Sequence, residues 1–245
     1  MLGLPLDCAT MAQSVERIGG YLQTPDFHLV VTLGTEMVVR AQTDASFREA
    51  VRSAALVIPD GIGTVWAARL RGFDMRERVA GVELVQVLAQ RLGGRLRVFL
   101  LGGAPGVAES AAQNLLRIAP GVHVAGSRDG YFQDDREVVE QIAASKANVL
   151  LAGLGFPRQE LWLQKHGPAC GVAVGIGVGG TFDVLSGRVR RAPRWMQKVG
   201  LEWLYRFALQ PSRWQRMLAL PKFAMRILTG GQDSVQAWPE GQATS

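Results

Sequence analysis

The sequence predicts an α/β fold in which helices cover both faces of a mainly parallel, Rossmann-like sheet. Strand-like runs alternate with helical segments, and these runs are apolar throughout, which is typical of parallel strands buried on both faces. The alternation stops near Arg188, where a basic, tryptophan-rich helical pattern begins. We therefore expect a core over residues 1–193, a basic helical appendage over residues 194–230 and a loose tail over residues 231–245.

Six apolar runs are predicted to be strands. The clearest is "RVFLLGG" at 97–103, which ends in a Gly-Gly turn. The other five lie at 27–33, 55–59, 122–126, 148–155 and 170–180. Glycine or polar residues close most of these runs, as expected where a strand passes into a loop.

Helices are predicted in the intervals between these strands. The helical pattern covers residues 36–41, 46–53, 62–70, 82–91, 134–145 and 157–166. A further helix is expected after Gly103, with Pro105 in its first turn, where proline is well tolerated. Polar residues in the first turn of the 157–166 helix are expected to be solvated.

Composition limits the class of protein. The chain has 245 residues, of which 48% are hydrophobic, enough for one large core with an appendage. No run approaches the roughly 18 apolar residues of a membrane-spanning helix, and the first residues lack the pattern of a signal peptide. Cys8 and Cys170 are the only cysteines, which indicates neither a disulfide framework nor a zinc motif and favours the cytoplasm.

Positive charge is concentrated near the C-terminus. Between Arg188 and Leu228 ten arginines and lysines stand against one acid, Glu202, so this segment carries +9 while the whole chain carries +6. Three tryptophans lie in the same segment, Trp195, Trp203 and Trp214. Cations beside indole rings favour an anionic membrane surface as partner. Nucleic-acid binding, the rival interpretation, would explain the cations but not the tryptophans.

Ligands of parallel sheets bind at the carboxyl ends of the strands. Asp60 is the outstanding candidate there, because in "VIPDGIG" it follows a strand directly and precedes glycines. It could cap the next helix or act as a general base at this edge, and the two roles are compatible. The other candidates are Thr32 and residues 102–103, 130–131, 153–159 and 177–183.

Two other kinds of site are disfavoured. The glycine clusters could cradle a diphosphate. None of them, however, gives a G-x-G-x-x-G pattern that opens a helix near the N-terminus and is followed by an acid about twenty residues later, as a nicotinamide-dependent oxidoreductase would. The pair at 134–135 is interpreted as a helix start, and the histidines show no ligand spacing. The sequence therefore predicts no metal and no cofactor.

Taken in order, several stretches resemble the WecG/TagA/CpsF family of bacterial glycosyltransferases. The most specific are "VIPDGIGTVWAARLRG" at 57–72 and "GVGGTFDVLSGRVRRAPRWMQKVGLEWLYR" at 177–206, and the likeness extends over roughly residues 10–228. The resemblance implies an inverting enzyme that takes a sugar, N-acetylmannosamine or its uronic acid, from a UDP donor. The acceptor would be a saccharide on undecaprenyl diphosphate.

The resemblance also implies a setting for the reaction. The enzyme would be peripheral on the inner face of the plasma membrane and would serve teichoic acid or exopolysaccharide synthesis. A UDP-glucose-dependent glucosyltransferase of exopolysaccharide assembly is the alternative. A homo-oligomer is compatible with this resemblance.

Individual roles follow by motif. Asp60 matches the family's catalytic base, and Thr32, Arg78 and Gln159 match residues that hold donor or acceptor. Nucleotide contacts are expected at Gly102, Tyr131, Gly155, Gly179 and Asp183. Phosphate contacts, in an appendage that closes over the site, are expected at Arg206, Arg213 and Arg216.

One position departs from the family pattern. The family commonly has asparagine two residues after the threonine that matches Thr32, whereas this chain has Gly34 followed by Thr35. An amide side chain offers about three or four hydrogen bonds to a sugar. Either the donor sugar differs or Thr35 replaces the amide.

Overall fold

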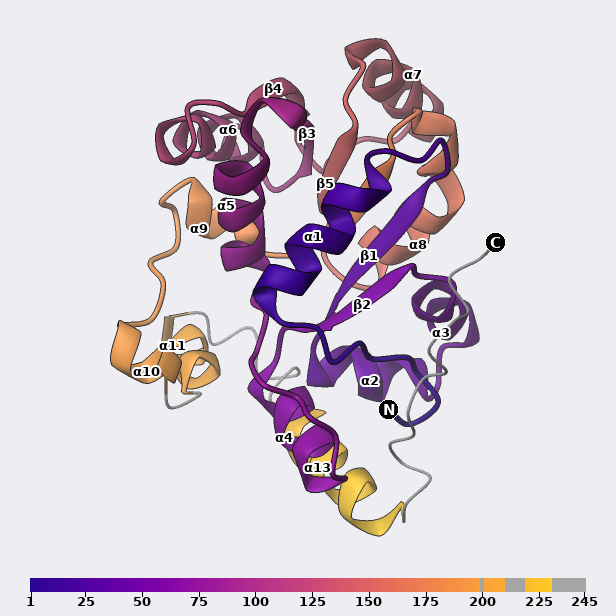
Figure 1. The fold of residues 1–245 in the computed structure, drawn as a ribbon, viewed down its shortest axis with the longest axis vertical. Coiled ribbons are helices and arrows are strands. Elements are labelled where there is room, and N and C mark those ends of the chain that lie inside the picture. Colours follow the sequence, from indigo (N-terminus) through magenta and orange to yellow (C-terminus); the bar gives the residue numbers. More distant parts are fainter. Residues whose placement is uncertain (199–200, 210–218, 231–245) are drawn as a thin grey trace.

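The computed structural model describes residues 1–198, 201–209 and 219–230, and within them the chain forms a six-stranded sheet (Figure 1). All neighbouring strands are parallel, in the order β2-β1-β6-β5-β3-β4. This sheet confirms the predicted α/β fold. The strands are β1 (His28–Leu33), β2 (Leu56–Pro59), β3 (Arg97–Gly102), β4 (His123–Arg128), β5 (Val149–Gly153) and β6 (Val174–Gly177).

Two strands differ in length from their predictions. β4 continues past residue 126 to Arg128, which pairs with Leu101 of β3. β6 is shorter than the run at 170–180, because Pro168–Cys170 form a 3-10 turn. At its other end, Gly179 has a φ of 51°, a left-handed conformation that ends an extended strand.

Seven helices coincide with predictions, and their bounds are α2 (Thr35–Ala41), α3 (Ala45–Arg52), α4 (Ile62–Leu70), α5 (Gly81–Leu92), α6 (Val107–Ile118), α7 (Asp135–Ser145) and α8 (Arg158–His166). Asp134 caps α7, so the pair at 134–135 is a helix start, as interpreted. Helix α1 (Met11–Tyr21) was not among the predictions, and it begins with a capping box between Thr10 and Gln13. The last described helices are α9 (Thr181–Leu185), α10 (Arg194–Lys198), α11 (Glu202–Leu209) and α13 (Ala219–Thr229).

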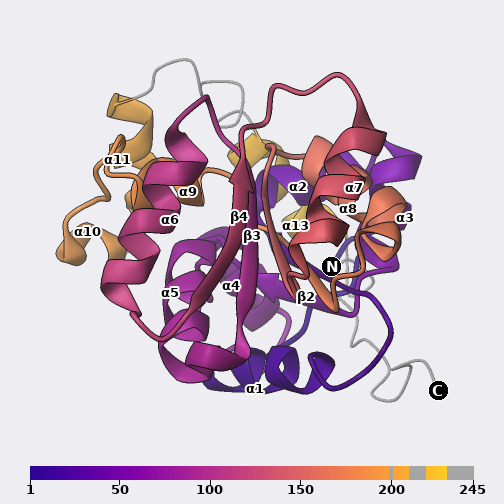
Figure 2. The same ribbon diagram turned by 90° about the horizontal axis from the view of Figure 1, so that it is seen from above.

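Helices cover both faces of the sheet (Figure 2). On one face, α1, α5, α6 and α9 pack over side chains that include Val30 and Leu100. On the other, α3, α7 and α8 pack over side chains that include Val31 and Leu101. Successive strand residues point to opposite faces. Because both faces are buried, the strands read as continuous apolar runs.

The connections of β3 and β5 diverge. The chain leaving β3 passes to β4 at the sheet edge, whereas the chain leaving β5 passes to β6 on the other side. Divergent connections leave a crevice at the carboxyl ends of adjacent strands, where ligands bind in folds of this kind. The loops after β3 and β5 flank this point.

Glycines in β6 let helix α8 lie directly on the sheet. A Cβ atom at Gly175 would be 2.8 Å from the Phe27 ring, and one at Gly177 would be 2.9 Å from the Glu160 carboxyl. The close approach buries Gln159 and Glu160, which are 3% and 0% exposed. The expectation of solvated polar residues in this first turn was therefore wrong for these two.

The burial of Glu160 changes its chemistry. Desolvation raises the pKa of its carboxyl from 4.5 to about 7, with a smaller contribution from the negative charge of Glu36. One carboxyl oxygen accepts a hydrogen bond from the Gln159 amide at 2.8 Å, and the other has no partner. The protonated form is thus favoured in the folded protein.

Part of the basic C-terminal segment belongs to the core. Phe223 and Ile227 of α13 are 2% and 0% exposed and join the same apolar cluster as Val31. Helix α13 packs against α2 and α4. Among the residues that the structure describes, no helix has the length and apolar character needed to cross a bilayer.

We predict that Glu160→Gln removes a pH-dependent loss of stability. The native carboxyl has the higher pKa, so the folded state binds more protons than the unfolded state between about pH 4.5 and pH 7. Wild-type stability should fall as pH rises through this window. The advantage of the variant, measured by urea unfolding, should grow by up to about 3 kcal/mol between about pH 5 and pH 8.

The control is Glu140→Gln, because the Glu140 side chain is 65% exposed in an ion pair with Arg136. It should follow the wild-type pH profile. A Glu160→Gln profile parallel to wild type would contradict the assignment of a raised pKa.

Candidate active site

A cavity of about 790 Å³ opens at the carboxyl ends of the strands. Since all six strands are parallel, the six following loops meet at this edge, and each contributes to the wall. Of the residues predicted from sequence, those that line the cavity are Thr32, Thr35, Asp60, Arg78, Tyr131, Gly155, Gln159, Gly179 and Asp183.

Asp60 lies between two elements of the cavity wall. Its backbone N–H donates to the Leu33 carbonyl at 3.2 Å, which ties the end of β2 to the end of β1. Its carboxylate accepts a hydrogen bond from the Gly81 backbone N–H at 3.3 Å. Gly81 is the first residue of α5, and a helix N-terminus stabilises negative charge. Asp60 is partly buried and faces the cavity as a held carboxylate.

Small residues pack tightly beside Asp60. The Thr32 hydroxyl donates to the Gly177 carbonyl at 2.8 Å and so joins the carboxyl ends of β1 and β6. A Cβ atom at Gly81 would lie 3.5 Å from the Thr181 hydroxyl. Thr32 and Thr181 are 6% and 3% exposed. These contacts fix the backbone around the carboxylate.

Glu36 occupies the space beside Gly34. A Cβ atom at Gly34 would be 2.8 Å from a carboxyl oxygen of Glu36. Glu36 also lines the cavity. From the sequence, only Thr35 was expected to replace the asparagine amide that the family commonly has at the position of Gly34. Thr35 is 5% exposed, and its methyl group would collide with a side chain at Gly63, at 2.5 Å. The wall at this point thus presents a carboxylate.

Gln159 connects two loops of the site. Its side-chain oxygen accepts hydrogen bonds from the backbone N–H groups of Gly155 and Gly179, both at 3.1 Å. Its amide nitrogen donates to Glu160. These bonds hold the loops after β5 and β6 at a fixed separation. Gln159 is therefore a support of the cavity wall as well as part of its lining.

The predicted nucleotide contacts divide into two groups. Gly102 is absent from the cavity lining; it has a φ of 135°, and a Cβ atom there would be 2.4 Å from the Gly153 backbone. Its role in the structure is close strand packing, and Gly103 lines the cavity in its place. Tyr131, by contrast, lines the cavity and is 78% exposed. Asp183, partly buried, faces the cavity from α9.

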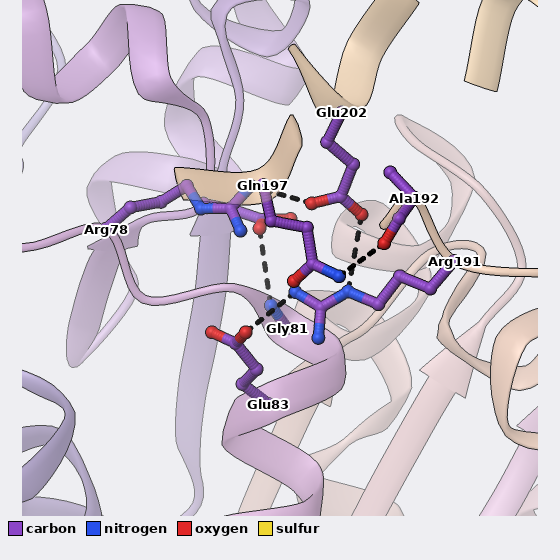
Figure 3. Close-up of polar contacts among 8 residues, drawn as sticks. Arg78, Gly81, Glu83, Arg191, Ala192, Gln197 and Glu202 are labelled. Carbon is purple, nitrogen blue, oxygen red and sulfur yellow. Dashed lines mark hydrogen bonds and ion pairs between the residues drawn. The ribbon is translucent and has the colours of Figure 1, made fainter. Parts of the chain in front are cut away.

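A network of ion pairs joins α11 to the core across the cavity wall (Figure 3). Glu202, with 8% of its side chain exposed, pairs with Arg78 at 3.0 Å and with Arg191 at 3.4 Å. Arg191 also pairs with Glu83 of α5 at 2.8 Å. Hence the acid that stands alone among the basic residues of this segment holds α11 against the core, beside the helix that anchors Asp60.

The predicted phosphate contacts lie largely outside the described residues. Arg206 belongs to α11 by its backbone, but its side chain is outside the description, and Arg213 and Arg216 fall between the described ranges. Within the described residues, Arg78, Arg158, Arg188 and Arg191 are the arginines that line the cavity. The part of the chain that the structure describes contains no cluster of three or more histidine, cysteine or acidic side chains arranged for a metal ion.

Four residues that line the cavity or join the ion-pair network beside it were not predicted from the sequence as site residues. They are Glu36, Glu83, Arg191 and Glu202. Only Glu202 carried a signal, as the single acid in a basic segment. Glu36 directly follows the predicted residue Thr35, whereas Arg191 and its partner Glu83 come together only through a tertiary contact.

Comparison with known proteins places this chain in a family. The model of the Glycosyl transferase WecG/TagA/CpsF family matches residues 1–234. An N-acetylglucosaminyldiphosphoundecaprenol N-acetyl-beta-D-mannosaminyltransferase of Bacillus spizizenii is 36% identical over 223 residues, which cover 91% of this chain and 87% of the relative. A Bacillus subtilis protein of the same name is 34% identical over 213 residues, covering 86% and 83%. The chain therefore belongs to the WecG/TagA/CpsF family of glycosyl transferases, as its motifs indicated.

Proposed function

We propose that this chain transfers N-acetylmannosamine from a UDP donor to N-acetylglucosamine on undecaprenyl diphosphate. The observation that carries the proposal is the Asp60 carboxylate, held by the first N–H of α5 at the wall of a cavity of about 790 Å³. The names of the two relatives support this donor sugar and this acceptor. They favour it over transfer of glucose.

The proposed reaction is a single displacement with inversion. The Asp60 carboxylate takes the proton of an acceptor hydroxyl while that oxygen forms a bond to the anomeric carbon. The bond from this carbon to the diphosphate oxygen breaks, and its electron pair leaves with UDP. A positioned base of this kind accelerates such a step by about 10²–10⁴-fold.

The departing diphosphate needs positive charge nearby. Arg78 and Arg191 line the cavity, but Glu202 and Glu83 balance their charges, so these two guanidinium groups would offer hydrogen bonds rather than net positive charge. The exposed Arg188 also lines the cavity. Together with backbone N–H groups of the glycine loops, they would stabilise the charge that develops on UDP.

The proposal includes a location and a docking segment. A lipid-linked acceptor requires the enzyme to act at a membrane surface, and we place this enzyme at the inner face of the plasma membrane. The basic residues between 194 and 230 would bind anionic headgroups there and close over the cavity. Each basic residue near such a surface contributes about 1 kcal/mol.

We predict that Asp60→Asn lowers kcat at least about 100-fold, because the amide cannot accept the hydroxyl proton. The assay is UDP release from UDP-N-acetylmannosamine with lipid-diphosphate N-acetylglucosamine. Binding of UDP, measured by calorimetry, should be retained. For comparison, Asp183→Asn should raise the donor KM more than it lowers kcat, if Asp183 contacts the uracil. Near-normal turnover of Asp60→Asn would reject the proposed base.

We predict that Glu36 selects a neutral donor sugar. Its carboxylate can accept hydrogen bonds from hydroxyl and amide groups but repels another carboxylate by several kcal/mol at contact distance. Wild-type enzyme should prefer UDP-N-acetylmannosamine over the corresponding uronate by at least about tenfold in kcat/KM. Glu36→Gln should narrow this ratio, and Thr35→Val should leave it unchanged. If Thr35→Val narrowed this ratio and Glu36→Gln left it unchanged, Thr35 would be the residue that selects the donor sugar.

We predict that Glu202→Gln loosens α11 from the core. It leaves two arginines without their shared carboxylate, which should reduce the free energy of unfolding by about 1–3 kcal/mol. The variant should also be cut faster by protease after residue 193. Glu83→Gln is the matched control, because Glu83 is 37% exposed and, within the part of the chain that the structure describes, pairs with one arginine, Arg191. Equal behaviour of the two variants would argue against a connecting role for Glu202.

A further inference from the structure

Helix α4 exposes a line of large apolar side chains. Ile62, Trp66 and Leu70 are 41%, 42% and 50% exposed. They are spaced four residues apart and so lie along one side of the helix. Other residues of α4, such as Val65 and Ala68, are buried at 2% and 1%. A contiguous exposed apolar line on an otherwise packed helix is typical of a binding surface.

Helix α13, beside α4, also exposes large apolar side chains. It packs against α4, and the two helices project together beyond the sheet at the lower end of Figure 1. Its Met225 and Leu228 are both 64% exposed. We call the exposed set on the two helices the apolar ridge, which consists of Ile62, Trp66, Leu70, Met225 and Leu228.

All charged side chains that belong to α4 and α13 are positive. Neither α4 nor α13 contains an acidic residue. Arg69, Lys222 and Arg226 are exposed. Arg71, just after α4, donates a hydrogen bond to the carbonyl of Ile227 and so ties the two helix ends together. Apolar side chains bordered by cations match a lipid interface with anionic headgroups.

The apolar ridge starts at the cavity. Ile62 lines the cavity and stands two residues after Asp60, and Leu220 lines it from the start of α13. The ridge then leads outward along α4 through Trp66 and Leu70. A bilayer that touched the ridge would therefore lie next to the cavity, where a lipid-linked acceptor would enter.

We propose that the apolar ridge and its neighbouring cations dock on the surface of an anionic lipid bilayer. The core helix α4 then contacts the membrane directly, in addition to the basic segment after residue 193. This proposal rests on the proposed function in one respect, the entry of a lipid-linked acceptor beside the apolar ridge. Its test measures lipid binding without any turnover.

The test compares two double variants in vesicle co-sedimentation. Trp66→Gln with Leu70→Gln removes two ridge side chains that do not line the cavity. The control, Leu116→Gln with Ile118→Gln, alters side chains of α6 that are 39% and 36% exposed. On phosphatidylcholine vesicles containing phosphatidylglycerol, the ridge variant should bind about tenfold or more weakly than wild type. The control should bind like wild type.

Two further measurements sharpen the result. Trp66→Phe keeps an apolar ring, so it should still bind vesicles, but quenching of tryptophan fluorescence by brominated lipid should decrease. With a detergent-solubilised acceptor, the ridge variant should keep wild-type turnover. If no protein transfers sugar, the proposed function fails, while the vesicle comparison still decides this inference.

Two outcomes would overturn the proposal. One is equal vesicle binding by the ridge and control variants. The other is a ridge variant that changes the oligomeric state in analytical ultracentrifugation while its vesicle binding stays at the wild-type level, since a second copy of the chain would then cover the ridge.

Discussion

The common direction of the six described strands is the constraint on which the site depends. It brings every strand's carboxyl end to one edge, so that loops far apart in sequence meet around one cavity. Asp60 gains its position from this arrangement: β1 and β2 set its backbone, and the start of α5 holds its carboxylate. A reversed strand would remove part of the cavity wall and the contacts that orient the Asp60 carboxylate.

Charge organises the second half of the site. The segment from Arg188 to Leu228 is strongly basic, yet its single acid, Glu202, forms ion pairs that hold it against the core. The same segment contributes Phe223 and Ile227 to the apolar cluster. Its exposed cations Lys222 and Arg226 are among those that we propose bind anionic headgroups.

The sequence predicted the sheet because strands buried on both faces are apolar at every position, as Val30 and Val31 illustrate. It placed Asp60 at the cavity because a strand end is visible in one short stretch. It missed α1, although the Thr10–Gln13 capping box was a readable signal. The burial of Glu160 was not predicted, because it depends on the distant Gly177. Arg191 could not be predicted, because only tertiary contacts bring it to the site, whereas Glu36 directly follows the predicted residue Thr35 and was overlooked.

The most direct test of the account is a crystal structure of the protein with UDP-N-acetylmannosamine. We expect UDP in the cavity, with its diphosphate near Arg78 and Arg191. The Asp60 carboxylate should lie on the side of the anomeric carbon opposite UDP. The space between the carboxylate and this carbon should be just large enough for one acceptor hydroxyl group. A nucleotide bound away from this cavity, or an Asp60 carboxylate on the same side as the diphosphate, would contradict it.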